Sequence, residues 1–106
     1  MHMDLKGMQA YTDDLILALK KRKMNYEVLD YGISVKNGLD TWLIEIMASS
    51  GHNKAMVKLY HKNLFHNKGR WKKEHGHGDM HIQFTKPCTV NYVVNYILQH
   101  GKKYSM

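Results

Sequence analysis

Apolar residues recur at helical spacing in the first quarter of the chain. Leu15 and Leu19 lie on one stripe with their apolar neighbours, which is typical of a helix that packs against a core. Thr12 is a suitable N-cap, and the basic run 20–23 suits a last turn, where positive charge favours the helix dipole. The pattern predicts a helix that begins at Thr12, with an earlier start near Asp4 left open.

After this helix, β-branched and aromatic residues at alternating positions predict strands. Asn37 and Gly38 are typical of a hairpin turn between the first two strands. Pro87 is expected to end the last strand, because proline cannot donate a backbone hydrogen bond. Four strands are expected, at residues 26–36, 41–48, 54–62 and 80–86.

A second helix is expected at residues 90–100. Thr89 is placed to cap its first turn, and Gly101 is placed to end it in a left-handed conformation. The order α-β-β-β-β-α favours a two-layer α+β fold, a four-stranded antiparallel sheet with two helices packed on one face. The chain of 106 residues is expected to form a single domain at 4–106, with residues 1–3 as a cloning remnant.

Alternation along the strands assigns their residues to two faces. Residues expected to face the helices are Trp42, Ile44, Ile46, Val57, Leu59, Met80, Ile82 and Phe84. Residues expected on the opposite face are Leu43, Glu45, Lys58, Tyr60, His81, Gln83 and Thr85. An open sheet face with an aromatic ring, a lysine and amide or imidazole donors is typical of proteins that bind single-stranded RNA. Side chains of this kind also occur on sheet faces without any ligand.

Composition narrows the class of protein. No apolar run is long enough to span a membrane, and the start lacks the layout of a secretory signal, so a cytoplasmic protein without membrane partner is expected. Cys88 is the only cysteine, which excludes an internal disulfide. A small buried cysteine beside a helix start is the common case, so Cys88 is interpreted as a packing residue rather than a nucleophile.

Positive charge is concentrated in one quarter of the chain. Residues 52–77 carry seven Lys/Arg and one Glu, whereas residues 1–51 carry six Lys/Arg and seven Asp/Glu. The net charge of the whole chain is +7. A concentrated basic patch attracts polyanions, of which nucleic acid is the expected partner, with RNA favoured over DNA. The alternative is a charged surface that only keeps the protein in solution.

A loop is expected at about 63–78, and loops of this length inside a compact domain are often functional. Basic residues around an exposed aromatic ring supply phosphate contact and base stacking together. The expected contacts in this loop are Lys68, Arg70, Trp71, Lys72 and Lys73, supported by Lys54, Lys58 and Lys62 on the preceding strand. In the alternative, Trp71 packs back against the domain and the lysines are only solvated.

Histidines recur with a period of two near the end of this loop. His75, His77 and His81 would lie on one side of an extended segment, and His61 would join His81 if their strands are neighbours. Imidazole is the commonest ligand of zinc and other transition metals, so these four histidines are a candidate metal site. No other cofactor is expected.

Metal-free catalysis is a further alternative. Small basic endoribonucleases combine histidine acid and base groups with lysine, arginine and tyrosine, and His61, His81 and Tyr60 are the candidate catalytic residues. This is an analogy of size and residue type, without a shared motif.

The last predicted helix offers a surface for a protein partner. Tyr92 and Tyr96 recur on one stripe, and tyrosine is enriched at protein interfaces, so dimerisation through this stripe or binding of an acidic partner is open. The sequence therefore leaves three hypotheses: a nucleic-acid-binding module, a small endoribonuclease, and an interaction or inhibitor protein without nucleic-acid affinity.

Overall fold

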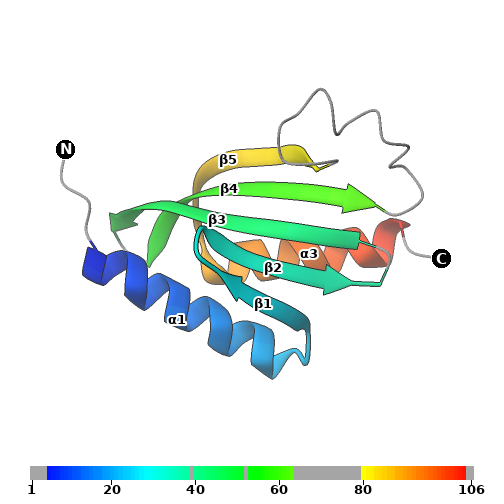
Figure 1. Ribbon diagram of the computed structural model, residues 1–106, viewed down its shortest axis with the longest axis horizontal. Helices are drawn as coiled ribbons and strands as arrows, with labels where there is room; N and C mark the ends of the chain where they lie inside the picture. Colours follow the sequence, from blue (N-terminus) through cyan, green and yellow to red (C-terminus); the bar gives the residue numbers. More distant parts are fainter. Residues whose placement is uncertain (1–4, 39, 52, 64–79, 105–106) are drawn as a thin grey trace.

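The computed structural model describes residues 5–38, 40–51, 53–63 and 80–104. Two helices flank five strands in the chain, and the strands form one antiparallel sheet in which sequence neighbours are also spatial neighbours (Figure 1). The elements are α1 (Leu5–Lys21), β1 (Asn25–Leu29), β2 (Gly32–Asn37), β3 (Asp40–Gly51), β4 (Lys54–Asn63), β5 (His81–Thr89) and α3 (Val90–Tyr104).

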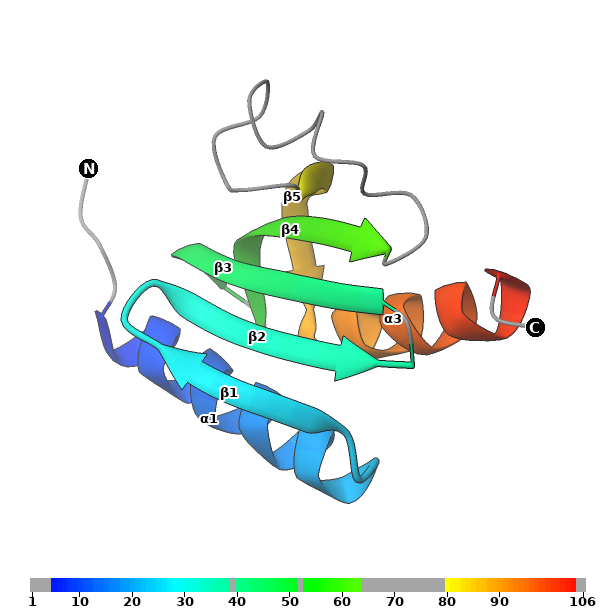
Figure 2. The same cartoon turned by 45° about the vertical axis from the view of Figure 1, so that its right-hand side comes forward.

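Both helices cover the same face of the sheet, as the turned view also shows (Figure 2). The predicted α+β fold with an antiparallel sheet and two helices is confirmed. The predicted strand number of four is wrong, because the first expected strand is a hairpin of β1 and β2. Neither helix in the described part of the chain has the length and apolar character needed to cross a bilayer.

The turn between β1 and β2 consists of Asp30 and Tyr31, since Leu29 pairs with Gly32. The sequence of this turn lacks the Asn-Gly or Asp-Gly pair that is typical of two-residue turns. The residues 26–36 were therefore predicted as one continuous strand. Gly32 also permits close approach of β2 to β3. A Cβ atom at this position would lie 2.4 Å from the carbonyl oxygen of Ile44.

The helix α1 begins at Leu5, in agreement with the earlier of the two predicted starts. Thr12 lies inside the helix, and its hydroxyl donates a hydrogen bond of 2.8 Å to the carbonyl oxygen of Met8, four residues earlier. The interpretation of Thr12 as an N-cap is therefore wrong: threonine serves at caps and also bonds back to the preceding turn. Of the basic run 20–23 predicted in the last turn, Lys20 and Lys21 lie there, whereas Arg22 and Lys23 follow the end of α1.

Two expectations about the end of the chain are also wrong. Pro87 lies within β5, which tolerates it because β5 is an edge strand with a single neighbour. Gly101 lies within α3, which continues to Tyr104. The cap at the start of α3 is confirmed, since the hydroxyl oxygen of Thr89 accepts a hydrogen bond of 3.1 Å from the backbone N–H of Tyr92.

The core lies between the helices and the sheet. Side chains from α1, α3 and the helix-facing positions of β2, β3 and β4 are buried together, as alternation predicts for β3 and β4. The fully buried members include Leu15, Leu19, Trp42, Ile44, Val57, Leu59, Val93 and Ile97. Burial of this apolar surface is the main source of stability in the fold.

The alternation is broken once, between β4 and β5. Leu59 pairs with Phe84, but the next residue, Tyr60, pairs with Ile82, so Gln83 is an extra residue on β5. Ile82 accordingly lies across from Tyr60 on the helix-free face and is 54% exposed. The expectation that Ile82 faces the helices is wrong. The extra residue reverses the alternation for the residues that precede it on β5.

We expect Gly32→Ala to destabilise the protein by about 1–3 kcal/mol, because the added methyl group would collide with backbone that has no room to move. Urea unfolding monitored by circular dichroism measures this loss. Lys36→Ala, an exposed position on the same strand, is the matched control and should change the free energy of unfolding by less than about 0.5 kcal/mol. Equal effects of the two changes would contradict the close approach.

Candidate functional site

Three rings from neighbouring strands lie in one row on the helix-facing side of the sheet. Trp42 on β3 pairs with His61 on β4, and His61 pairs with His81 on β5. The ring centroids are 4.2 Å apart for Trp42 and His61, and 5.2 Å apart for His61 and His81. The strands β4 and β5 are neighbours, so the condition under which His61 would join His81 is met. The two rings meet on the helix-facing side of the sheet, whereas His81 was predicted on the opposite face; the bulge in β5 accounts for the difference.

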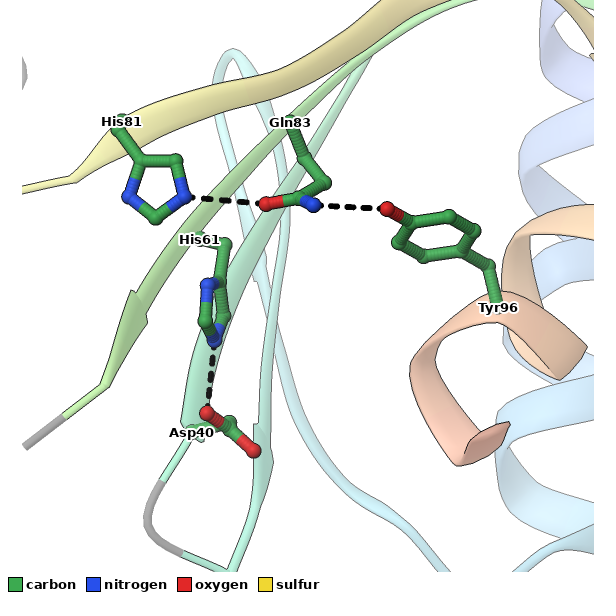
Figure 3. A network of polar contacts seen from close by, with 5 residues as sticks. All are labelled: Asp40, His61, His81, Gln83 and Tyr96. Carbon is green, nitrogen blue, oxygen red and sulfur yellow. Dashed lines mark hydrogen bonds and ion pairs between the residues drawn. The ribbon is translucent and has the colours of Figure 1, made fainter. Parts of the chain in front are cut away.

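A buried carboxylate orients the central ring. Asp40 Oδ1 lies 2.7 Å from His61 Nε2, and the two residues are 2% and 5% exposed (Figure 3). A carboxylate oxygen only accepts hydrogen bonds, so Nε2 carries the hydrogen and donates it. Asp40 is the first residue of β3 and His61 is close to the end of β4, so the pairing of these two strands creates the contact.

This arrangement leaves the other ring nitrogen of His61 as a base. Nδ1 is buried and has no hydrogen-bond partner among the described residues. Burial lowers the pKa of His61, and the neighbouring His100 and His81 lower it further, whereas the hydrogen bond to Asp40 acts in the opposite direction. The ring is therefore neutral at pH 7, with the lone pair on Nδ1.

A third histidine approaches from the helix α3. The ring of His100 lies 4.5 Å from that of His61 and 5.0 Å from that of Trp42, measured between centroids. Asp40, His61 and His100 each offer one donor atom, and these three atoms lie within 4.8 Å of one another. The strands β3 and β4 and the helix α3 thus bring together a donor set of two imidazoles and one carboxylate.

A short chain of hydrogen bonds holds His81 beside this group. His81 Nε2 lies 3.0 Å from Gln83 Oε1, and Gln83 Nε2 donates a hydrogen bond of 2.7 Å to the hydroxyl of Tyr96 (Figure 3). Gln83 therefore faces the helix α3, which corrects its expected place on the helix-free face. The correction has the same cause as for His81: the extra residue in β5 reverses the alternation.

The helix-free face of the sheet carries the described lysines of the basic quarter of the chain, Lys54, Lys58 and Lys62, together with Lys36. Lys36, Thr41 and Lys62 pair across β2, β3 and β4, which places two lysines in one row. Lys58 lies on the same side of β4 and opposite Glu45, and Lys54 is exposed at the start of that strand. Leu43, Glu45, Lys58, Tyr60 and Thr85 lie on this face as predicted.

Tyr60 does not provide the exposed ring that the sequence led us to expect on this face. It is only 1% exposed, and its hydroxyl donates a hydrogen bond of 3.4 Å to Glu45. Lys58 lies over the ring, with its ammonium group 5.5 Å from the centroid. Tyr60 therefore offers no ring face for base stacking in this structure, and it lies on the other side of the sheet from His61.

Several predicted contacts lie outside the described residues. These are Lys68, Arg70, Trp71, Lys72, Lys73, His75 and His77. The binding role of the segment at about 63–78 and the part of the metal hypothesis that rests on His75 and His77 stay predictions.

The tyrosine stripe on α3 is partly occupied by contacts within the molecule. Tyr96 accepts the hydrogen bond from Gln83, and its ring packs against Phe84 with centroids 5.1 Å apart. Tyr92 is exposed, and its hydroxyl accepts a hydrogen bond from Lys86. A dimer through this stripe stays a prediction, with Tyr92 as its more accessible residue.

Cys88 is buried, as the sequence indicated. Burial raises the pKa of its thiol, which keeps the thiol protonated at neutral pH. A protonated thiol without access to solvent is a poor nucleophile. Its surroundings therefore favour the packing role.

Sequence reasoning missed two residues of the histidine group. These are Asp40 and His100, neither of which was among the candidate ligands or catalytic residues. The pairing of Trp42 with His61 would have placed Asp40 two residues along the same face, but it requires the β3–β4 register.

Comparisons with protein-family models, curated proteins and solved structures gave no match.

In EDTA, the free energy of unfolding should fall as the pH is lowered from 7 towards 5. The folded pKa of His61 lies below its unfolded value, so the unfolded chain binds more protons in this range and gains stability. His61→Gln, which retains an N–H donor for Asp40, should reduce this slope by at most about 1.4 kcal/mol per pH unit. Urea unfolding at several pH values measures the slope. An unchanged slope would argue against a neutral, buried His61.

Proposed function

We propose that the protein binds nucleic acid through the helix-free face of its sheet and the basic segment that follows β4. The observation that carries this proposal is the row of Lys36, Thr41 and Lys62 across three strands. Neighbouring strands are about 4.8 Å apart, so the two lysines stem from points roughly 10 Å apart on one surface. Long lysine side chains at this spacing suit contacts with separate phosphates of one backbone.

The charge distribution supports the same surface. β4 leads directly into the segment of highest positive charge, and Lys62 lies at that end of the strand. Lys58 is expected to contribute less, because it lies opposite the carboxylate of Glu45, which compensates part of its charge. Since Tyr60 is buried, we expect phosphate contacts rather than base stacking to dominate on the sheet itself.

The double change Lys36→Gln and Lys62→Gln should weaken binding and lower the slope of log affinity against log salt by about two units. The measurement is fluorescence anisotropy with labelled single-stranded and duplex RNA and DNA at several salt concentrations, in EDTA. The control is Lys6→Gln with Lys20→Gln, which removes the same charge from exposed positions on α1. The proposal predicts a much smaller effect for the control pair.

The basic segment is tested in the same assay by Arg70→Gln, Lys72→Gln and Lys73→Gln together. We expect a further loss of up to about three units of slope. Binding that is salt-independent, or unaffected by both the sheet and the segment changes, would remove the proposal.

A second candidate function is RNA cleavage, favoured by the adjacent rings of His61 and His81. Nδ1 of the neutral His61 carries the lone pair of a base, but it is buried, so a proton would reach it through the adjacent ring of His81, which is held in place through Gln83 and Tyr96. Of the two rings, His81 is the more accessible to solvent. A base and an acid on neighbouring strands are the groups that phosphodiester cleavage without a metal requires.

If this candidate is right, labelled RNA is cleaved in EDTA, and His61→Gln or His81→Gln slows cleavage by about 100-fold or more. Gel analysis of single-stranded RNA measures the rate, with circular dichroism to check folding. His52→Gln is the control for loss of a histidine elsewhere in the chain. Intact RNA after long incubation, or equal cleavage by all variants, would leave binding without catalysis.

A further inference from the structure

The histidine group has the composition of a transition-metal site. Its donor atoms are imidazole nitrogens from β4 and α3 and a carboxylate oxygen from β3. Imidazole suits zinc, copper, nickel and iron, whereas calcium and magnesium prefer sites made of oxygen atoms alone. Two nitrogen ligands and one oxygen ligand also occur at catalytic zinc sites, where water takes the fourth position.

The geometry fits an ion after small side-chain movements. Zinc lies about 2.0–2.2 Å from nitrogen and oxygen ligands, so ligands at the corners of a tetrahedron are roughly 3.4 Å apart. In the structure the three donor atoms lie within 4.8 Å of one another, and Asp40 Oδ1 and His61 Nε2 are already 2.7 Å apart. To bind an ion, the Asp40 and His61 atoms would separate slightly and the His100 nitrogen would approach them.

We propose that Asp40, His61 and His100 bind one divalent transition-metal ion, with zinc as the expected ion. Asp40 Oδ1 and His61 Nε2 bind the ion, which takes the place of the hydrogen that lies between them in the metal-free protein. The His61 ring stays neutral, and its hydrogen moves from Nε2 to Nδ1. This site is independent of nucleic-acid binding and differs from the set His61, His75, His77 and His81 that sequence spacing indicated.

The surroundings of His61 support this assignment. Its Nδ1 is buried without a hydrogen-bond partner in the described part of the chain, so no hydrogen bond at Nδ1 opposes the tautomer that ligation through Nε2 requires. The ring of His81 is perpendicular to that of His61, with centroids 5.2 Å apart. Trp42 closes one side through contacts with both ligating rings, which shields the site from water.

The first test is calorimetric titration of the metal-free, untagged full chain with zinc. Because other histidines bind metals weakly, the background is His75→Gln with His77→Gln, which leaves the proposed ligands intact. We expect one equivalent of zinc to bind both the unchanged chain and this background. Loss of the tight equivalent in the background would overturn the proposal, since the metal would then depend on the segment at about 63–78.

In this background, His100→Gln should lower zinc affinity by at least about 100-fold, beyond the loss typical of groups that only hydrogen-bond a ligand. His81→Gln is the control, since its ring adjoins the site but is not among the three ligands; we expect less than a tenfold change. Asp40→Asn should resemble His100→Gln. Zinc affinity unchanged in His100→Gln would exclude the assignment.

A spectroscopic measurement keeps the test independent of whether these variants fold. In Trp71→Phe, Trp42 is the remaining tryptophan, and its ring lies 4.2 Å from His61 and 5.0 Å from His100. Paramagnetic Co²⁺ should quench Trp42 fluorescence at one equivalent, and zinc should reverse the quenching. Cobalt that binds without quenching Trp42 would place the metal elsewhere and overturn the proposal.

Discussion

The buried hydrogen bond between Asp40 and His61 sets the constraint on which this end of the fold depends. Removing a carboxylate from water costs several kcal/mol, and only a well-placed donor offsets that cost. The donor is in place because the β3–β4 register puts Trp42 beside His61, with Asp40 two residues away on the same face. An apolar pair of similar volume would be about as stable. Stability alone therefore does not account for a polar pair at this position.

The parts of the fold that follow from local sequence were predictable. The stripe of Leu15 and Leu19, the Asn37-Gly38 turn and the Thr89 cap each depend on residues close in sequence. Where two local uses compete, sequence reasoning failed. Thr12 is as suitable for a cap as for a bond to the preceding turn, and only the start of α1 at Leu5 decides between them.

The histidine site was predictable only in part, because it depends on three long-range relations. Neighbouring strands bring His61 to His81, and alternation alone would have put them on opposite faces. The bulge that turns His81 and Gln83 towards α3 has no proline or glycine to mark it. His100 joins the group through the rotation of α3 about its axis, which depends on how Val93 and Ile97 pack on the sheet. Val93, Ile97 and His100 are spaced i, i+4 and i+7, so the sequence alone could have placed His100 on the face of α3 that packs on the sheet.

The strand β4 separates the two proposed sites. His61 faces the helices, whereas Lys58 and Lys62 face the other way, so each set can be changed without removing side chains from the other. An ion held by Asp40, His61 and His100 would link β3, β4 and α3, elements that are distant in sequence. The entropic cost of closing a loop rises by about 0.6 kcal/mol for each doubling of the loop length. A link between elements that are distant in sequence therefore stabilises the folded chain more than a link between close ones. Metal binding would thus stiffen the strand that presents the lysines without contacting them.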